Sequence, residues 1–480
     1  MWQRGVKLAL GIYRRKNHMT VTGHQLLDAG FEQGPEFGKA LKEVNQEGFE
    51  VETLSAWVSE NKPAPRMKLQ SSPNLIVNLE AETPEEIDNR NKVIETMNVV
   101  MRTPIVESGV IMPDACPAGP IGTIPVGGVI ASKGGIHPGM HSADICCSMM
   151  VSVFKDAEPL KILDAIHSVT HFGPGGRTNG KRFTLSPKMY DAMRDNPFLS
   201  SNKALQLATE HMGTQGDGNH FAFVGTNNAG NVCLVTHHGS RGPGAFLYSS
   251  AIKMAERMTR RIAEGVLKQN AWIPVDSREG EDYWAALQLI RKWTKANHSC
   301  LHAAAADVAN VKVSDRLWNE HNFVFQDDDV FYHAKGATPV HDAFLPDTGG
   351  VQIVPLNMAQ PVLLIEGSKN ERNLGFAPHG AGRNMSRTKH RKLIGDKTDE
   401  YVFATETAGI DARFWCGNID VTELPSAYKD GQNVRRQMAE MGLANVVDEI
   451  MPFGAIMAGD WERDAPWRKK HDIKNKSVEG

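Results

Sequence analysis

Three short apolar runs between residues 104 and 154 decide the fold class: IVESGVIM (105–112), IPVGGVIAS (124–132) and MMVSVF (149–154). Clusters of glycine, proline and aspartate separate these runs from one another. Short apolar runs bounded by turn-forming residues are typical of β-strands joined by loops. The sequence therefore predicts a strand-and-loop region over these residues.

Further strands and helices are expected on either side of this region. The apolar runs NVCLVTHH (231–238) and QPVLLIEGS (360–368) predict buried strands. Apolar residues recur at helical spacing within 85–101, 281–310 and 426–445, which predicts helices there. Strands and helices are thus mixed along the chain, and we expect a fold of the α+β class.

The two ends of the chain differ from its middle. Residues 1–67 predict a small helical N-terminal extension, with two short helices around a Gly-Pro turn and a proline-containing linker. Residues 459–480 form a basic C-terminal tail with few apolar side chains. The residues between them, 68–458, contain the other patterns, and we expect them to form a single large domain.

The composition excludes several classes of protein. Hydrophobic residues make up 41% and charged residues 23% of the 480 positions, which excludes a disordered or fibrous chain. The formal net charge of −3 excludes a globally basic nucleic-acid binder, although a local basic groove remains compatible with it. No apolar run approaches the ~18 residues that span a membrane. Six cysteines without a C-x-x-C pair fit a reducing compartment, so we expect a cytoplasmic protein.

Five segments place polar side chains at the end of an apolar run or inside a glycine-rich turn. Each one alone is typical of an ordinary turn or of a hydrogen-bonded histidine. Together they offer one carboxylate, one thiolate and three imidazoles, a set that could hold one or two divalent ions such as zinc, iron or manganese. A thiolate could bridge two such ions, which would neutralise phosphate charge. The segments are HSADICCSMM (141–150), GTQGDGNHF (213–221), VTHHGSRGPG (235–244), NEHNFVF (319–325) and FAPHGAGRNMSR (376–387).

In this order the segments resemble the RtcB family of RNA ligases. The resemblance covers residues 68–458 and implies a catalytic domain of mixed β-sheets with surrounding helices. The family's Asp-Ile-Asn-Cys-Gly motif corresponds to DICCS here, and its Gly-Asn-His-Phe, His-x-Gly-Ser-Arg-Gly and His-Gly-Ala-Gly-Arg motifs are present. The matching stretches are 144–148, 218–221, 237–242, 321–322, 335–338, 379–383 with 386–387, and 427–430.

The resemblance implies an activity. Such ligases join RNA that ends in a 3′-phosphate or 2′,3′-cyclic phosphate to RNA with a 5′-hydroxyl, using GTP and two Mn²⁺ ions. A histidine attacks the α-phosphorus of GTP and becomes guanylylated, and the nucleotide then activates the RNA 3′-phosphate. The partners implied are RNA with broken ends, such as tRNA or rRNA, and a nucleoside triphosphate. Some relatives use an activating protein partner.

The resemblance also implies roles for particular residues. By motif the nucleophile is His379, whereas His238 fills a variable position and is not expected to be a metal ligand. The implied metal ligands are Asp144, Cys147, His220, His237 and His321, with Cys147 as the bridge. The implied nucleotide contacts are Asn219, Gly380, Ala381, Gly382, Ser386 and Tyr428, and the implied RNA contacts are Arg241, Arg383 and Arg387.

The chain departs from the family pattern at the base-reading positions. The family has an acidic residue where this chain has Phe223, and a lysine where it has Met457. An unpaired base edge costs about 1–3 kcal/mol per polar group, so ATP or another nucleotide is an alternative to GTP. Asp114 is retained and could support the site. These departures indicate a divergent branch of the family.

Two other functions are compatible with the same residues. A metal-dependent RNA phosphodiesterase or cyclic-phosphate hydrolase would keep the metal ligands and make little use of His379. A non-catalytic RNA-binding scaffold would explain the lost base readers, although the complete ligand set argues against it. Replacement of His379 separates ligation from hydrolysis, because only ligation needs a histidine nucleophile.

Overall fold

The computed structural model describes residues 20–34, 36–47, 51–62, 65–178, 180–345 and 349–463. This part of the chain divides into two compact units. The smaller unit contains the described residues up to Met67 together with Arg260–Glu264, and the larger unit contains the rest. Within the described residues, no helix combines the length and apolar character that crossing a membrane requires.

The smaller unit is built from short helices around a core of its own. Its helices are α1 (Gly23–Asp28), α2 (Phe37–Glu47) and α3 (Val51–Asn61). Thr22 begins α1 with a capping box that includes Gln25. The sequence predicted two helices here, and the structure has a third, α3. This helix supplies Trp57 to the same core. Buried members of this core are Leu26, Phe31, Val44, Leu54 and Trp57.

Two sheets form the framework of the larger unit. The five-stranded sheet has the order β1-β2-β3-β11-β10, and the eight-stranded sheet has the order β13-β14-β17-β6-β7-β5-β9 with β16 paired to β17. The strands of the first sheet are β1 (Asn74–Val77), β2 (Val106–Cys116), β3 (Val126–Lys133), β10 (Asn322–Asp327) and β11 (Val330–Lys335). Those of the second are β5 (Ser148–Phe154), β6 (Phe221–Asn227), β7 (Val232–His238), β9 (Val313–Glu320), β13 (Gln352–Val354), β14 (Val362–Glu366), β16 (Asp411–Phe414) and β17 (Asn445–Met457).

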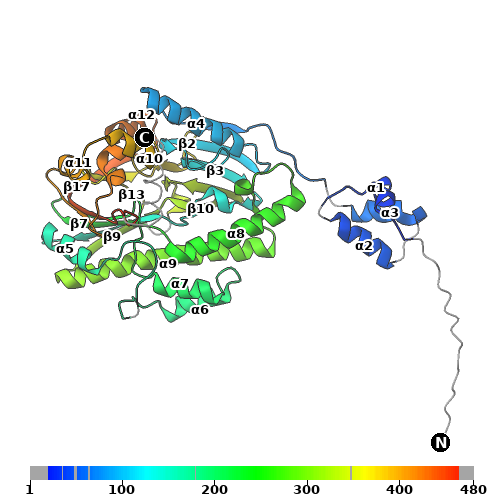
Figure 1. Cartoon of the computed structure of the whole chain (residues 1–480), viewed down its shortest axis with the longest axis horizontal. Helices are drawn as coiled ribbons and strands as arrows, with labels where there is room; N and C mark the ends of the chain where they lie inside the picture. Colours follow the sequence, from blue (N-terminus) through cyan, green and yellow to red (C-terminus); the bar gives the residue numbers. More distant parts are fainter. Residues whose placement is uncertain are drawn as a thin grey trace, which may run out of the picture. The chain divides into compact units, whose positions relative to one another are not determined.

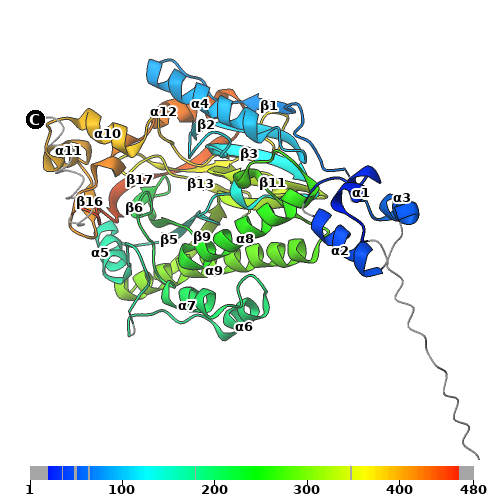
Figure 2. The same ribbon diagram turned by 45° about the vertical axis from the view of Figure 1, so that its right-hand side comes forward.

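Helices cover the outer faces of this framework. In Figures 1 and 2, α8 and α9 run side by side on one side of the strands, and α4 lies on the opposite side. Thr83 caps α4, whose first residue is Pro84, so the sequence itself defines where this helix begins. The helices are α4 (Pro84–Val100), α5 (Pro159–Val169), α6 (Pro187–Asp195), α7 (Asn202–Glu210), α8 (Arg241–Ile262), α9 (Arg278–Ala309), α10 (Arg387–Ile394), α11 (Asp399–Glu406) and α12 (Gly431–Glu440).

Two short two-stranded sheets complete the larger unit. The strands β12 (Ala337–Pro339) and β15 (Phe376–Pro378) pair with each other, as do β4 (Gly135–Ile136) and β8 (Ile273–Pro274). Because β12 follows β11 directly, the β12–β15 pair attaches the chain after Pro378 to the five-stranded sheet. This pairing fixes where the segment that begins at His379 leaves the sheet.

Apolar side chains fill both faces of the eight-stranded sheet. On one face Phe154 and Leu234 pack with Leu301 of α9. On the other face Val151 and Val235 pack in a separate cluster. Successive side chains of a strand point to opposite faces, so β5 and β7 each contribute to both clusters. This alternation also decides which polar residues at the strand ends face a cavity and which face α9.

The predicted elements are largely confirmed. The runs 105–112, 124–132, 149–154, 231–238 and 360–368 correspond to β2, β3, β5, β7 and β14. The predicted helix at 281–310 is α9, and the helical pattern at 85–101 is α4. The helix predicted at 426–445 is shorter, because α12 ends before Gly442, which has a φ of +63° that favours glycine. Of the predicted basic tail, residues 464–480 lie outside the described part.

Candidate functional site

Residues from several strands meet at one edge of the eight-stranded sheet. Cys147 immediately precedes β5, His220 immediately precedes β6, and His237 lies at the end of β7. The antiparallel register places Phe221 opposite His237, so the start of β6 coincides with the end of β7. Chain segments that are far apart in the sequence therefore bring their polar ends together.

The neighbouring strand β9 adds a fourth side chain to the same edge. Ser148, the first residue of β5, pairs with both His238 and Glu320. His321 follows Glu320 directly, and its backbone N–H donates to the Cys147 carbonyl at 2.9 Å. The sheet register therefore carries His321 to the cysteine.

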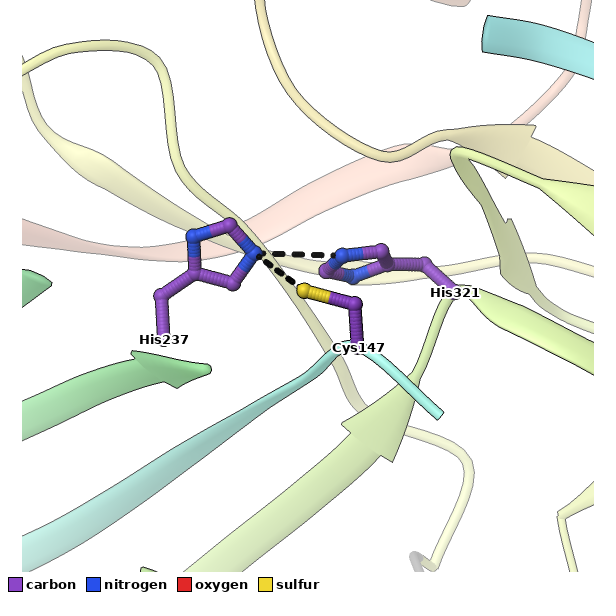
Figure 3. Close-up of side chains that lie close together, drawn as sticks. All are labelled: Cys147, His237 and His321. Atoms are coloured by element: carbon purple, nitrogen blue, oxygen red, sulfur yellow. Dashed lines mark hydrogen bonds between the residues drawn. The ribbon is translucent and has the colours of Figure 1, made fainter. Parts of the chain in front are cut away.

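Five side chains form a cluster at this edge, centred on Cys147; all are buried except Asp144, which is partly exposed. The Cys147 Sγ lies 3.2 Å from His237 Nε2 and 3.5 Å from His220 Nε2. His237 Nε2 lies 3.2 Å from His321 Nε2, as Figure 3 shows. His220 Nε2 lies 3.1 Å from Asp144 Oδ2. Side-chain atoms at these separations can converge on a common ion, since metal–nitrogen and metal–sulfur bonds are about 2.0–2.3 Å.

Two histidines of the cluster are oriented through their second ring nitrogen. His220 Nδ1 contacts the Gln215 carbonyl at 2.7 Å, and His237 Nδ1 contacts the Asn219 carbonyl at 3.0 Å. When each Nδ1 carries the proton, each Nε2 has a free lone pair that is directed into the cluster. Such backbone contacts fix the tautomer of histidines that bind metals.

Burial sets the protonation of the cluster. Desolvation lowers the pKa of His237 to about 3 and holds the pKa of His321 well below its usual value. Desolvation, reinforced by Asp144, raises the pKa of the Cys147 thiol well above its usual value. Burial also opposes ionisation of Asp144, but His220 and Arg241 outweigh it and lower its pKa. Neutral imidazoles and a carboxylate are ready ligands, whereas the thiol needs a cation to release its proton.

The donor set fits divalent metal ions. Cys147, His237 and His321 form one group of converging ligand atoms, and Asp144, Cys147 and His220 form a second. Cys147 belongs to both groups, so its sulfur is the atom that could contact two ions. A mixture of sulfur, imidazole nitrogen and carboxylate oxygen suits a transition-metal ion rather than magnesium or calcium.

His379 lies next to this cluster and is oriented by a buried carboxylate. Its Nδ1 lies 2.5 Å from Asp114 Oδ2, and its backbone N–H donates to the same oxygen at 3.1 Å. Asp114 lies on β2 and is fully buried. The ring centroids of His379 and His321 are 4.9 Å apart. The carboxylate holds the Nδ1 proton, which leaves Nε2 as the nitrogen with a free lone pair.

Two glycines allow the close approaches that the site requires. A Cβ atom at Gly382 would lie 1.9 Å from the Asp114 carbonyl oxygen, and the φ of Gly382 is +72°. A Cβ atom at Gly239 would lie 1.9 Å from Asp144 Oδ1. A larger residue would displace the Asp114 backbone at the first position and the Asp144 carboxylate at the second.

A cavity of about 440 Å³ connects the cluster with His379 and continues to an apolar end. Phe223 and Met457 line that end and are buried. They come from the paired strands β6 and β17, where Phe223 lies opposite Ala455 and Phe221 lies opposite Met457. Other lining residues include Asn219, Lys335, Met358, Val362, His379, Gly380, Ala381, Gly382, Arg383, Arg387, Glu423 and Tyr428.

Glu423 joins three of the predicted site residues inside this cavity. It accepts hydrogen bonds from Arg383 Nη2 at 2.8 Å, Arg387 Nε at 2.9 Å and Tyr428 Oη at 2.5 Å. The Arg383 guanidinium also lies over the Tyr428 ring, with Cζ 4.7 Å from the ring centroid. One carboxylate against two guanidiniums leaves this wall of the cavity net positive, which suits a bound phosphate.

Three predicted residues do not line the cavity: His220, which belongs to the cluster, and Ser386 and Arg241, which have other contacts. Ser386 caps α10, because its hydroxyl accepts from the Lys389 N–H at 3.2 Å. Arg241 begins α8 with a φ of +50° and donates from Nη2 to the Gly173 carbonyl at 3.2 Å. A positive φ at an arginine is a backbone strain of the kind that clusters at functional sites.

Sequence reasoning missed the parts that depend on long-range contacts. Glu423 lies 36 and 40 residues from its two arginines, and no motif marked it. Asn322 follows His321 in a motif that assigns it no role, yet its side-chain oxygen accepts from the Gly336 N–H at 2.7 Å. Lys335 begins the matching stretch 335–338 without an assigned role; it lines the cavity, and burial lowers its pKa to about 8.

The fold and the site define the class of protein: an α+β protein in which one sheet edge can hold metal ions beside a carboxylate-oriented histidine. The sequence pattern of the family described as "tRNA-splicing ligase RtcB" matches residues 177–458. A relative with that name from Thermococcus kodakarensis is 26% identical over 451 residues, which cover 77% of this chain and 92% of the relative. The "RNA-splicing ligase RtcB" of Escherichia coli K12 is 25% identical over 380 residues, covering 72% and 89% respectively. The chain belongs to the RtcB family.

Proposed function

We propose that this protein is an RNA ligase that joins a 3′-phosphate or 2′,3′-cyclic phosphate end to a 5′-hydroxyl end through a nucleotidylated His379. The observation that carries the proposal is the contact between His379 Nδ1 and the buried Asp114, in the cavity that also contains Cys147 and His321. A histidine held in this way presents Nε2 as a nucleophile. Family membership supports the ligase activity, because the relatives are named as splicing ligases.

The proposed reaction has three steps. His379 Nε2 forms a bond to the α-phosphorus of a nucleoside triphosphate, and pyrophosphate leaves. An oxygen of the RNA 3′-phosphate then attacks that phosphorus, which frees His379 and forms a phosphoanhydride. Finally the RNA 5′-hydroxyl loses its proton and attacks the RNA phosphorus, which forms a 3′,5′-phosphodiester and expels the nucleoside monophosphate. Water opens a cyclic phosphate before these steps.

The chain's own residues would hold and neutralise the reacting phosphates. Asp144, Cys147, His220, His237 and His321 are the proposed ligands of two Mn²⁺ ions, which when bound would supply positive charge beside the phosphates. Asn219, Gly380, Ala381, Gly382, Ser386 and Tyr428 are the proposed nucleotide contacts. Arg241, Arg383 and Arg387 are the proposed contacts to RNA phosphates.

GTP is the nucleotide that the family resemblance implies. The apolar end of the cavity, with Phe223 and Met457, offers no charged group to the polar edge of guanine. We therefore propose that this protein selects guanine weakly and accepts ATP as well. A base can still be held there by apolar contact with its faces.

Nucleotidylation tests the nucleophile. The protein is incubated with Mn²⁺ and each α-³²P-labelled nucleoside triphosphate in turn, and an acid-labile protein adduct is measured. We expect label in the wild-type protein, no label in His379→Ala, and unchanged label in His341→Ala. His341 is a suitable control because it also contacts a carboxylate, that of Asp327 at 3.2 Å, and does not line the cavity.

Joining assays with RNA oligonucleotides test the ligase against the two alternatives. Joined product from 3′-phosphate and 5′-hydroxyl RNA that disappears in His379→Ala supports the proposal. Hydrolysis of a cyclic phosphate that persists in His379→Ala, without joining by the wild-type protein, would identify a phosphodiesterase instead. RNA binding with neither reaction would identify a scaffold.

Metal content tests the ligand assignment independently of activity. Cys147 belongs to both groups of converging ligands, so Cys147→Ala should remove both ions, whereas His321→Ala should remove one. Cys416→Ala, which changes a cysteine outside the cavity, should keep the wild-type content. Elemental analysis after dialysis against Mn²⁺ measures this, and equal content in all variants would contradict the assignment.

A further inference from the structure

The side of the eight-stranded sheet that faces α9 carries buried hydroxyl groups among its apolar side chains. Away from the site this side carries Phe154 and Leu234, which pack in the α9 core. The same sides of β5 and β7 also carry Ser148, Ser152 and Thr236, all fully buried. Ser148 and Thr236 lie nearer the site, whereas Ser152 pairs with Leu234. A helix packed on a sheet normally buries apolar groups, so buried hydroxyls at these positions need hydrogen-bond partners.

Two histidines of α9 supply these partners. Thr236 Oγ1 lies 2.6 Å from His298 Nδ1 and 2.7 Å from His302 Nε2. His302 Nδ1 lies 2.8 Å from Ser152 Oγ, and His298 Nε2 lies 3.1 Å from Ser148 Oγ. His298 and His302 are one helical turn apart, so both project towards the sheet. One rigid helix thus contacts both strands that end at the cluster.

The two ends of this chain of hydrogen bonds fix its direction. At one end Arg316 Nε, which can only donate, contacts Ser152 Oγ at 3.2 Å. At the other end His298 Nε2 lies 3.3 Å from the His238 carbonyl, which can only accept. One order of donation satisfies both ends, with the hydroxyls and the Nε2–H groups donating from Arg316 towards His238. In this order both imidazoles, those of His298 and His302, are neutral with the proton on Nε2.

Burial agrees with the neutral state of these imidazoles. Desolvation lowers the pKa of His302 to about 3, and it holds the pKa of His298 well below its usual value. The chain ends on a backbone carbonyl, which cannot take up a proton, so its geometry suits a fixed scaffold rather than a proton path. The ring of His238 packs against this chain of hydrogen bonds as well. It stacks on the His298 ring, and the two ring centroids are 3.4 Å apart.

We propose that Thr236, His298 and His302 are positioning residues that fix the ends of β5 and β7 so that Cys147 and His237 can hold a common metal ion. Ser148 follows Cys147, and Thr236 precedes His237, so a shift of either hydroxyl moves a ligand. The proposal rests on the metal site of the proposed function. Groups that support metal ligands typically contribute 10–100-fold to metal affinity.

Thr236→Val tests this inference, because it removes the shared hydroxyl and keeps the shape of the side chain. Co²⁺ titration of the full-length protein reports both affinity and, through the visible spectrum, the geometry around the ion. We expect Co²⁺ to bind about 10–100-fold more weakly to Thr236→Val, with altered absorption bands. Thr236→Ser should restore both, and Thr226→Val on β6 should match the wild-type protein.

The outcomes separate the two proposals. A wild-type protein that binds no Co²⁺ would overturn the metal site and this inference with it. Wild-type binding together with unchanged affinity and spectrum in Thr236→Val would overturn this inference alone. If Thr236→Val does not fold, Ser152→Ala breaks the same chain at His302, and unchanged Co²⁺ binding in that variant would overturn the inference equally.

Discussion

His379 is partly buried, and the group that contacts its Nδ1 is a fully buried carboxylate. Asp114 accepts from both the ring and the backbone N–H of His379, so ring and main chain are fixed by one oxygen. When Nε2 bonds to phosphorus and Nδ1 keeps its proton, the imidazole becomes positively charged. The fully buried carboxylate of Asp114 stabilises that charge.

Asp114→Asn should slow nucleotidylation while leaving metal binding intact. The amide retains an acceptor for Nδ1 but loses the negative charge, so we expect a rate about 10²–10⁴-fold lower. Single-turnover labelling with an α-³²P nucleotide measures the rate. Asp327→Asn is the matched control, because Asp327 contacts His341 away from the cavity. An unchanged rate in Asp114→Asn would show that orientation by Asp114 is not needed.

At this scale the sequence predicted which residues meet and not how they are supported. Asp144, Cys147, His220, His237 and His321 lie together as the motifs indicated. The support came from residues without a motif, such as Glu423, or with an unassigned one, such as Asn322. Their partners lie many residues away in the sequence, and only the tertiary fold brings them into contact.

The strands explain why distant motifs converge. Apolar runs predicted β2, β3, β5, β7 and β14, because burial of an apolar run is a local signal. Pairing was not predictable from these runs, since β5 lies between β7 and β9 and β17 lies between β14 and β6. Register depends on contacts between strands that are far apart in the chain. The clustering of the site is a property of this register.

The pairing of β6 with β17 should also determine nucleotide selection. Phe223 and Met457 lie on these two strands and line the apolar end of the cavity. The double variant Phe223→Glu/Met457→Lys introduces an acceptor and a donor for the guanine edge. We expect the ratio of GTP to ATP labelling to rise by about 10-fold or more, since each polar pairing is worth about 1–3 kcal/mol.

Competition labelling with equal GTP and ATP measures this ratio, and a thermal unfolding curve checks that each variant folds. The control Val447→Glu/Met451→Lys introduces the same charges on exposed positions of β17 and should leave the ratio unchanged. A ratio that stays at the wild-type value in the Phe223→Glu/Met457→Lys variant would show that the base does not occupy this end of the cavity.

Across the whole molecule, many histidines are buried as neutral groups. His137, His141, His298, His302 and His333 are fully buried. Desolvation lowers the pKa of each below its usual value. A neutral imidazole can both donate and accept a hydrogen bond, which makes it useful inside a polar layer. The same property makes the folded state sensitive to acid, because a buried imidazole resists protonation.

The metal-free protein should therefore lose stability between pH 6.5 and pH 5. The pKa of His137 and His141 is about 4 and that of His302 about 3 in the folded state, against 6.5 when exposed. The unfolded chain binds protons first as the pH falls through 6.5, so the free energy of unfolding decreases; above that pH the histidines impose no penalty. Each should contribute roughly 1–2 kcal/mol to the loss by pH 5.

Carboxyl groups of the unfolded chain titrate near pH 4, so this window isolates the histidines. Urea midpoints at pH 7.5, 6.5, 5.5 and 5.0, in EDTA, measure the effect, and a midpoint independent of pH would show that the buried imidazoles find acid-stable partners.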